Sequence, residues 1–202
     1  MKLKYGVVTF LILFIFIFSA SASEKINVTF NACVDGDTAY FNVDNKKTKF
    51  RFLALDTPES VHPKKKVEPF GKEASNFVCD LLKNAKKLQI QYDDNSKKTD
   101  KYDRDLAWIF VDDVLLQEKV IENGLGQVAY IYGEYEYVDK LCLVQSESKE
   151  LKKGVWSNDS YIDGYCNKEK KPTKKKEVTT YSLFILILLS FLTIIVKYLK
   201  KR

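Results

Sequence analysis

Short apolar runs separated by polar turn residues recur through the first half of the chain. Their lengths and their alternation predict β-strands rather than helices. The predicted strands cover residues 26–34, 37–43, 50–55, 88–92 and 106–111. Asp35-Gly36 is typical of a two-residue hairpin turn, which would place Asp37 at the first position of the second strand. The first three strands should therefore form a meander.

Apolar residues also recur with helical spacing. One such set falls at positions i, i+3, i+4, i+7 and i+8, and consists of Ala74, Phe77, Val78, Leu81 and Leu82. The predicted helices cover residues 70–85, 114–122 and 137–152, and a short extended piece is expected at 127–132. A helix after the third strand and two after the fifth predict an α+β, mainly β fold: a five-stranded closed barrel of the oligonucleotide-binding (OB) type with three helices.

The N-terminal segment has the layout of a secretory signal peptide. Lys2 and Lys4 precede an apolar run at residues 7–18, and small residues lead to Ala22. We expect cleavage after Ala22. An uncleaved membrane anchor is the alternative, and either reading sends the following domain across a membrane.

The C-terminal segment has the length and character of a membrane span. Residues 181–199 are mostly apolar over about 20 positions, which suffices to cross a bilayer. We expect the end of this span to face the cytoplasm. The lysines at 168–176, on the other side of the span, would by themselves favour the opposite orientation, but the first segment usually sets the topology. The expected organisation is a signal peptide at 1–22, a barrel domain at 23–167, a lysine-rich stem at 168–180, a transmembrane helix at 181–199 and a cytoplasmic tip at 200–202.

Net charge and cysteine content indicate which class of binding partner and which cellular compartment suit this chain. The net charge of +6 favours an anionic partner, either nucleic acid or a lipid surface. The four cysteines would face an oxidising compartment, where three disulfide pairings are open. They are Cys33, Cys79, Cys142 and Cys166. No cysteine and histidine spacing suits zinc, and the only histidine, His62, lies in a predicted loop.

The stretch FRFLALDTPES at residues 50–60 combines burial with charge. Arg51 interrupts an apolar run, and a buried guanidinium needs an anion beside it. Pro58 stiffens the turn after the strand, so that the carboxylates of Asp56 and Glu59 project from a fixed position. Hard oxygen ligands beside a cation that can hold phosphate suggest a metal site for phosphodiester chemistry. A structural salt bridge at a strand end is the alternative.

Several motifs in fixed order resemble the staphylococcal nuclease (thermonuclease-like) family. The resemblance covers about residues 34–156. The motifs are VDGDT at 34–38, FRFLALDTPES at 50–60, HPKK at 62–65, FGKEAS at 70–75, TDKYDR at 99–104, GLGQVAYIY at 124–132 and GVWS at 154–157. Each motif alone is weak, but their order and gaps are highly specific.

The resemblance implies a five-stranded barrel with three helices that cleaves DNA and RNA with calcium, leaving 3′-phosphate and 5′-hydroxyl ends. The implied Ca²⁺ ligands are Asp37, Asp56 and the backbone carbonyl of Thr57. The implied catalytic residues are the phosphate-clamping Arg51 and Arg104 and the general-base candidate Glu59. The implied substrate-binding residues are Lys101, Tyr102, Tyr130 and Tyr132 in a nucleotide pocket, with Lys64 and Lys65 on a basic loop at its rim.

One departure from the family pattern lies beside Arg104. Asp103 and Asp105 stand where the family commonly has glycine at one or both places. The two carboxylates would weaken the hold of Arg104 on phosphate if they paired with it. We expect them to point away, because neighbours in an extended chain lie on opposite faces.

The main hypothesis is a membrane-anchored, monomeric nuclease, with no protein partner and with its catalytic domain on the extracellular or luminal side. The alternative is a surface receptor that binds nucleic acid on the same fold without cleaving it. Such a receptor would show salt-sensitive binding and no products.

Overall fold

The computed structural model describes residues 23–61, 67–157 and 165–166. These residues belong to the first of two compact units, Met1–Asn167, and the second unit is Lys168–Arg202. The predicted signal peptide, lysine-rich stem, transmembrane helix and cytoplasmic tip all lie outside the described residues. In the part of the chain that is described, no helix has both the length and the apolar character needed to cross a membrane.

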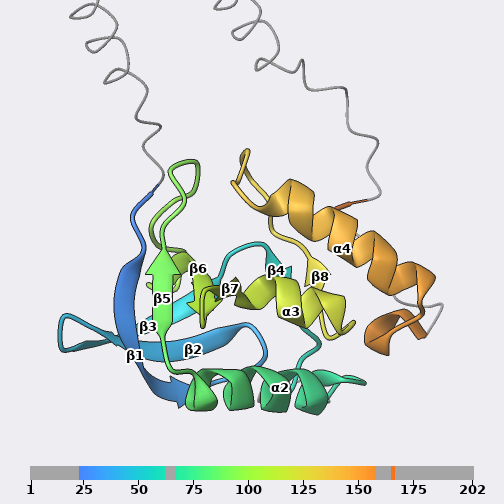
Figure 1. The fold of residues 1–202 in the computed structure, drawn as a ribbon, viewed down its shortest axis with the longest axis horizontal. Helices are drawn as coiled ribbons and strands as arrows, with labels where there is room; N and C mark the ends of the chain where they lie inside the picture. Colours follow the sequence, from blue (N-terminus) through green and yellow to red (C-terminus); the bar gives the residue numbers. More distant parts are fainter. Residues whose placement is uncertain (1–22, 62–66, 158–164, 167–202) are drawn as a thin grey trace, which may run out of the picture. The chain divides into compact units, whose positions relative to one another are not determined.

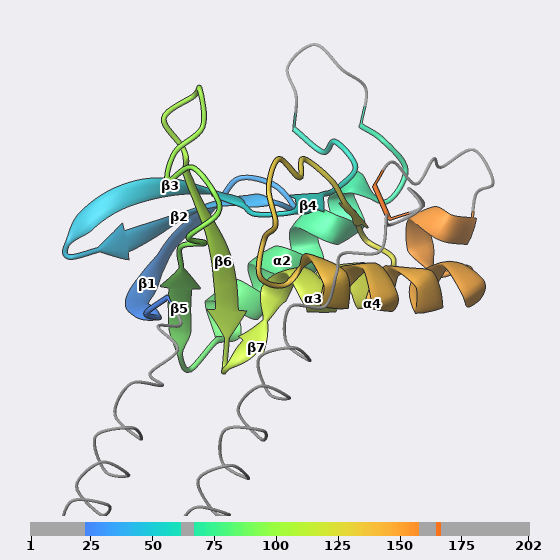
Figure 2. The ribbon, with the colours of Figure 1, turned by 90° about the horizontal axis from the view of Figure 1, so that it is seen from above.

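Five strands close into a barrel in Figures 1 and 2. The strands of the barrel are β1 (Ile26–Cys33), β2 (Thr38–Val43), β3 (Lys46–Phe52), β5 (Leu88–Gln91) and β6 (Asp105–Val111). They neighbour one another in the order β3-β2-β1-β5-β6, and a parallel pairing of β3 with β6 closes the ring. The remaining strands are the short β4 (Leu55–Asp56), β7 (Val114–Leu115) and β8 (Gln127–Val128). This topology agrees with the predicted five-stranded OB-type barrel.

The two connections of the meander differ. Between β2 and β3, Asp44 and Asn45 form a two-residue turn in which both have positive φ, at 48° and 65°. Between β1 and β2, the predicted two-residue hairpin at Asp35-Gly36 is wrong, because Cys33 pairs with Ala39 and residues 34–37 form a longer loop. The Asp35 side chain accepts a hydrogen bond from the Asp37 amide, which folds this loop on itself. Asp37 therefore immediately precedes β2.

The predicted strand at residues 50–55 is also interrupted. β3 ends at Phe52, Leu53 and Ala54 form a turn with Ala54 at φ 57°, and β4 then leaves the barrel to pair with β8. The buried side chain of Gln117 fixes this turn by donating to the carbonyl oxygens of Leu53 and Ala107. The interruption directs the end of the stretch, Asp56, toward β8.

Three helices complete the described fold, as predicted. They are α2 (Gly71–Asn84), α3 (Leu116–Glu122) and α4 (Val138–Glu150), and a short 3₁₀ turn, η1 (Gly154–Ser157), follows. Figure 1 shows α2 along one end of the barrel, with α3 and α4 next to each other at its side. The apolar side of α2 buries Ala74, Val78 and Leu82, which is the periodicity expected from the sequence.

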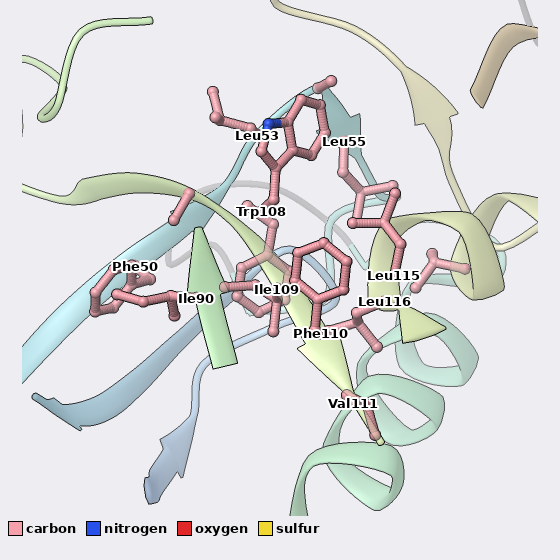
Figure 3. Packing of buried hydrophobic residues seen from close by; sticks show 14 of the residues in the cluster. Phe50, Leu53, Leu55, Ile90, Trp108, Ile109, Phe110, Val111, Leu115 and Leu116 are labelled. Carbon is pink, nitrogen blue, oxygen red and sulfur yellow. The ribbon is translucent and has the colours of Figure 1, made fainter. Parts of the chain in front are cut away.

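Large apolar side chains from the strands fill the barrel (Figure 3). Phe50, Ile90, Trp108 and Ile109 come from β3, β5 and β6 and are fully buried, and Figure 3 shows the Trp108 ring beside Leu53 and Leu55. The indole nitrogen of Trp108 donates to Asp93 Oδ2 at 2.9 Å, so its polar atom is satisfied. The packed interior gives the residues at the strand ends a rigid base.

Two disulfides select one of the three pairings that the sequence left open. Cys33 at the end of β1 is bonded to Cys79 in α2, with a Cα–Cα distance of 5.8 Å. Cys142 in α4 is bonded to Cys166, with a Cα–Cα distance of 5.4 Å.

Candidate active site

Arg51 is held by anions, as its burial requires. Its Nη1 lies 2.9 Å from Asp37 Oδ1 and its Nη2 lies 3.8 Å from Asp56 Oδ1. The same Nη1 donates to the carbonyl oxygen of Leu55 at 2.7 Å. Asp37 comes from the β1–β2 loop, Arg51 from β3 and Asp56 from β4, so the interrupted strand brings the three together.

Asp37 is fixed by a second set of hydrogen bonds. Its Oδ2 accepts from the Thr57 amide at 3.2 Å and from the Thr57 hydroxyl at 3.3 Å, and its Oδ1 accepts from the Thr38 hydroxyl at 3.0 Å. Gly36 makes this approach possible, because a Cβ there would lie 2.6 Å from Thr57 Oγ1. The carbonyl of Thr57 is therefore carried on a turn that is tied to Asp37.

Around Arg51, the carboxylates outnumber the single guanidinium. Burial and then the nearby Asp37 raise the pKa of Asp56 above its ordinary value, although Arg51 opposes the shift. Burial and Asp37 likewise raise the pKa of Asp35 to about 7. Sequence reasoning missed Asp35, although it lies within the motif VDGDT.

A divalent cation fits this charge distribution. Two carboxylates and one carbonyl are hard oxygen donors of the kind that Ca²⁺ binds, with room for water as further ligands. Within the described ranges there is no group of three or more acidic, histidine or cysteine side chains arranged to hold a metal ion. A metal here would consequently rely on backbone and water oxygens besides Asp37 and Asp56.

Gln127 supports Asp56 from the opposite strand. Asp56 faces Gln127 in the β4–β8 ladder, and the Gln127 Nε2 donates to Asp56 Oδ2 at 3.3 Å. Close backbone packing maintains this register, because a Cβ at Gly126 would lie 2.8 Å from the Asp56 carbonyl oxygen. Sequence reasoning did not single out Gln127, since its role depends on a strand pairing between distant segments.

Glu59 has a separate environment. Its Oε1 accepts from the Val61 amide at 3.0 Å, and its own amide donates to Glu68 Oε2 at 2.9 Å. Among the described contacts, the Glu59 carboxylate makes no ion pair with Arg51 or Arg104. The basic-loop residues Lys64 and Lys65 lie outside the described residues, as does His62.

A groove of about 1030 Å³ gathers the remaining predicted residues. The predicted site residues that line it are Arg51, Lys101, Tyr102, Arg104, Tyr130 and Tyr132. Exposed fractions of 66%, 57% and 85% for Tyr102, Tyr130 and Tyr132 leave these rings open to a ligand. Arg51 belongs to both the carboxylate cluster and the groove, because its guanidinium contacts the carboxylates and its side chain lines the groove.

Each arginine lies next to an aromatic ring of the groove. Arg51 Cζ is 5.4 Å from the centroid of the Tyr130 ring, and Arg104 Cζ is 5.4 Å from that of Tyr102. Tyr130 has φ 57°, so the predicted extended piece at 127–132 is a strand only at Gln127–Val128. The guanidinium of Arg51 thus lies over the Tyr130 ring.

Arg104 is paired with a residue that sequence reasoning missed, Asp100. Asp100 Oδ2 lies 2.7 Å from Arg104 Nη2 and accepts from Arg104 Nε at 2.8 Å. Asp100 Oδ1 accepts from the amides of Tyr102 and Arg104 at 2.8 Å and 3.1 Å. Partial burial raises the pKa of Asp100, but the hydrogen bonds from Arg104 and Tyr102 outweigh it and lower the pKa.

The two extra acids beside Arg104 do not pair with it in the described structure. Asp105 accepts a hydrogen bond from the Tyr92 hydroxyl, and Asp103 is exposed. Neither acid pairs with Arg104, as expected. The expected reason, an extended chain with neighbours on opposite faces, is wrong for Asp103. Asp103 lies in a turn with φ 57° and not in an extended chain.

Comparisons with known proteins identify a family model and several relatives that the chain is similar to. The family model described as "Staphylococcal nuclease homologue" matches residues 49–158. The chain is 37% identical over 145 residues to Endonuclease YncB of Bacillus subtilis, covering 71% of this chain and 68% of that protein. It is 36% identical over 162 residues to the SPbeta prophage-derived endonuclease YokF of the same organism, covering 78% of this chain and 54% of that protein.

A third relative comes from a staphylococcus. The chain is 36% identical over 125 residues to the Thermonuclease of Staphylococcus hyicus, covering 62% of this chain and 72% of that protein. The matched family region includes Arg51, Asp56, Glu59 and Arg104, the residues that the barrel places at its strand ends and loops. On the family match, these identities and the barrel topology, the chain belongs to the staphylococcal nuclease family.

Proposed function

We propose that this chain is a calcium-dependent nuclease, held at a membrane with its barrel facing outward, that hydrolyses DNA and RNA to 3′-phosphate and 5′-hydroxyl ends. Family membership carries the coarser statement that the chain is a phosphodiester-hydrolysing endonuclease. The observation that carries the site assignment is the position of Arg51. It lies between a cluster of carboxylates and a groove lined with aromatic and basic residues.

The two arginines suit the charge that develops during hydrolysis. A phosphodiester under attack gains negative charge on its non-bridging oxygens, and forked guanidiniums can donate to two of these oxygens at once. Arg51 and Arg104 line the same groove, and each is already oriented by a carboxylate, Asp37 and Asp100 respectively. This orientation places the donors before the substrate arrives, which avoids reorganisation during the reaction.

The exposed tyrosines suit a substrate of varied sequence. Tyr102, Tyr130 and Tyr132 offer ring faces on which any base can stack, and stacking is tolerant of base identity. Lys101 lies 4.9 Å from the centroid of the Tyr102 ring and adds a positive charge at the same place. The groove therefore supports binding of both DNA and RNA without a strong sequence preference.

Asp37, Asp56 and the carbonyl of Thr57 are the proposed calcium ligands. The raised pKa of Asp56, caused by burial and by Asp37, marks an uncompensated negative charge that a divalent cation would offset. When bound, calcium supplies positive charge beside the phosphate that Arg51 holds. Gln127 keeps Asp56 in position from β8.

Glu59 is the proposed base for the attacking water. The described contacts engage one of its two carboxylate oxygens, with the Val61 amide, and the other oxygen is available to orient a water. The Glu59 amide donates to Glu68 Oε2, and the Glu68 amide donates to the Glu59 carbonyl oxygen, both at 2.9 Å. These two hydrogen bonds fix the loop segment that carries Glu59.

The proposed location rests on sequence and on the disulfides. Residues 1–22 have the pattern of a signal peptide and residues 181–199 that of a membrane span, and both segments lie outside the described residues. The two disulfides support folding in an oxidising compartment.

Cleavage of a labelled single-stranded oligonucleotide by the full chain, with calcium or with chelator, tests the proposal. We expect calcium-dependent cleavage that falls about 100-fold or more in Glu59→Gln and in Arg51→Lys. Lys83→Gln, a change at an exposed lysine of α2, should leave the rate unchanged. Salt-sensitive binding without cleavage would contradict the nuclease proposal and favour the receptor alternative.

A further inference from the structure

β3 carries two more basic residues on the face that bears Arg51. Side chains alternate across a strand, so Lys47, Lys49 and Arg51 share one face, while Phe50 is fully buried on the other. The neighbouring strand β2 places Asn42 beside Lys47 and Tyr40 beside Lys49. We call Lys47, Lys49, Tyr40 and Asn42 the β3 ridge.

The ridge holds its lysines over an aromatic ring. The Nζ atoms of Lys47 and Lys49 lie 4.5 Å and 5.6 Å from the centroid of the Tyr40 ring. Contacts of this kind restrict flexible lysine side chains without neutralising them. The ammonium groups are therefore collected on the surface of the hairpin, with their charge available.

The polar neighbours of the ridge are uncharged. Asn42 Nδ2 donates to the Thr29 hydroxyl at 3.2 Å, and Asn31 Nδ2 donates to Asn42 Oδ1 at 3.1 Å. Within the described ranges, neither Lys47 nor Lys49 forms an ion pair with a carboxylate. Two unpaired cations on a fixed strand form a binding surface for an external anion.

The ridge leads directly into the active site. Two residues of a strand rise about 7 Å, so that Lys47, Lys49 and Arg51 are evenly spaced along β3. This spacing is comparable to that of consecutive phosphates in an extended polynucleotide. Figures 1 and 2 both show the β2–β3 hairpin projecting away from the three helices.

We infer that the β3 ridge is an extended substrate subsite, which binds the phosphates of a single strand that continues from the phosphate held at Arg51. The inference rests on the proposed function of the site. A single strand is the fitting occupant because an extended backbone can keep one phosphate opposite each cation of the strand, and the polyanion extends over both lysines at once. The ridge thereby favours long, single-stranded substrates over short ones.

The test compares a ridge variant with a matched variant of equal charge. Lys47→Gln/Lys49→Gln removes both ridge charges from the full chain. Lys83→Gln/Lys86→Gln removes two exposed charges at the end of α2 and just beyond it. The substrates are a thymidine oligonucleotide of about 12 residues, within the span of one barrel of this type, and a dinucleotide, whose single phosphate cannot reach the ridge from Arg51.

Two measurements are made on each variant: kcat/KM with calcium, and equilibrium binding of the oligonucleotide in chelator at several salt concentrations. The ridge variant should lose roughly fivefold more kcat/KM on the oligonucleotide than on the dinucleotide, because only the longer substrate extends over the lysines. The slope of log affinity against log salt should become shallower by about 1.4, at about 0.7 for each phosphate contact with a single strand. The α2 variant should show neither change.

Other outcomes separate the inference from the proposed function. Equal losses on both substrates, or identical behaviour of the two variants, would overturn the ridge as a subsite. Cleavage absent in every protein, with weaker oligonucleotide binding only in the ridge variant, would refute the nuclease proposal and retain the subsite. Unchanged oligonucleotide binding with weaker attachment to phosphatidylserine vesicles would assign the ridge to lipid and overturn the inference.

Discussion

Asp100 shows how a single carboxylate can prepare an arginine for phosphate. It accepts from Nε and Nη2 of Arg104 with one oxygen, and with the other it closes the turn that leads into β6. Arg104 thus enters the groove with its direction fixed, and part of its donor set remains for the substrate. Asp100 acts through Arg104, so it is a positioning residue.

Replacing Asp100 with asparagine should affect both stability and activity. Asp100→Asn removes the charged partner, and we expect a loss of about 1 kcal/mol in the free energy of unfolding at neutral pH. The lowered pKa in the folded state means that the stabilisation is present above the ordinary pKa of 3.8 and is lost as the pH falls through the folded-state value. Urea unfolding of both proteins at neutral and acid pH should therefore show a difference that disappears in acid.

The kinetic readout distinguishes positioning from a purely structural role. We expect kcat/KM for an oligonucleotide to fall about tenfold in Asp100→Asn because Arg104 loses its fixed direction. Asp100→Glu should recover part of that loss. A stability difference that persisted unchanged in acid would contradict the assigned charge interaction.

Sequence reasoning at the residue scale worked best where a residue type was out of place. Arg51 within an apolar run required an anion, and the structure supplies Asp37 and Asp56. Asp100 and Gln127 gave no such signal, because polar residues in a polar loop or a short strand are ordinary. Their roles depend on which segment folds beside them.

At the scale of elements, the interruption of β3 positions the site. Residues 50–55 are apolar except for Arg51, and they contain no glycine, proline or asparagine that would indicate a turn. The turn at Leu53 and Ala54 is held by a hydrogen bond that Gln117, far along the chain, donates to the Leu53 carbonyl oxygen. The local pattern could therefore predict a buried extended run but not its break.

The β1–β2 loop depends on close packing between Gly36 and Thr57. A Cβ at position 36 would lie 2.6 Å from Thr57 Oγ1 and 2.9 Å from Thr57 Cβ. Gly36→Ala should destabilise the fold by about 2 kcal/mol and lower activity, because overpacking separates the loop from the turn that carries the Thr57 carbonyl.

A double variant tests the cause of that loss. Gly36→Ala/Thr57→Gly removes the side chain that the new methyl group would meet while it keeps the backbone carbonyl. Thermal unfolding of the single and double variants should show that the two changes are less than additive. Strict additivity would show that the contact is not the source of the loss.

For the whole molecule, closure of the barrel could be predicted but its covalent cross-links could not. The order and lengths of the apolar runs indicated a small barrel with three helices, and the motif order indicated the family. Disulfide pairing depends on which Cα atoms lie within about 7 Å, which only the three-dimensional fold decides. Cys33 and Cys79 come from elements that are distant in sequence. Cys142 is bonded to Cys166, which lies at the edge of the domain.

The Cys33–Cys79 bond should make a large contribution to stability. It closes a loop with a sequence separation of 46 residues, for which the chain-entropy estimate gives about 4 kcal/mol. Cys33→Ala/Cys79→Ala should therefore lower the midpoint of urea unfolding substantially. The same substitutions should have no effect when the wild-type protein is also reduced. A variant as stable as the oxidised wild type would rule out this contribution.

The Cys142–Cys166 bond also determines how tension would travel through the domain. A pull on the chain beyond Cys166 reaches the fold at Cys142, in the first half of α4, because the disulfide is the shorter covalent path. The second half of α4 and the η1 turn with its buried Trp156 are then shielded from the load. A pull on a tether at the C-terminal side of the domain would therefore act on α4 at Cys142 and would not load the second half of that helix.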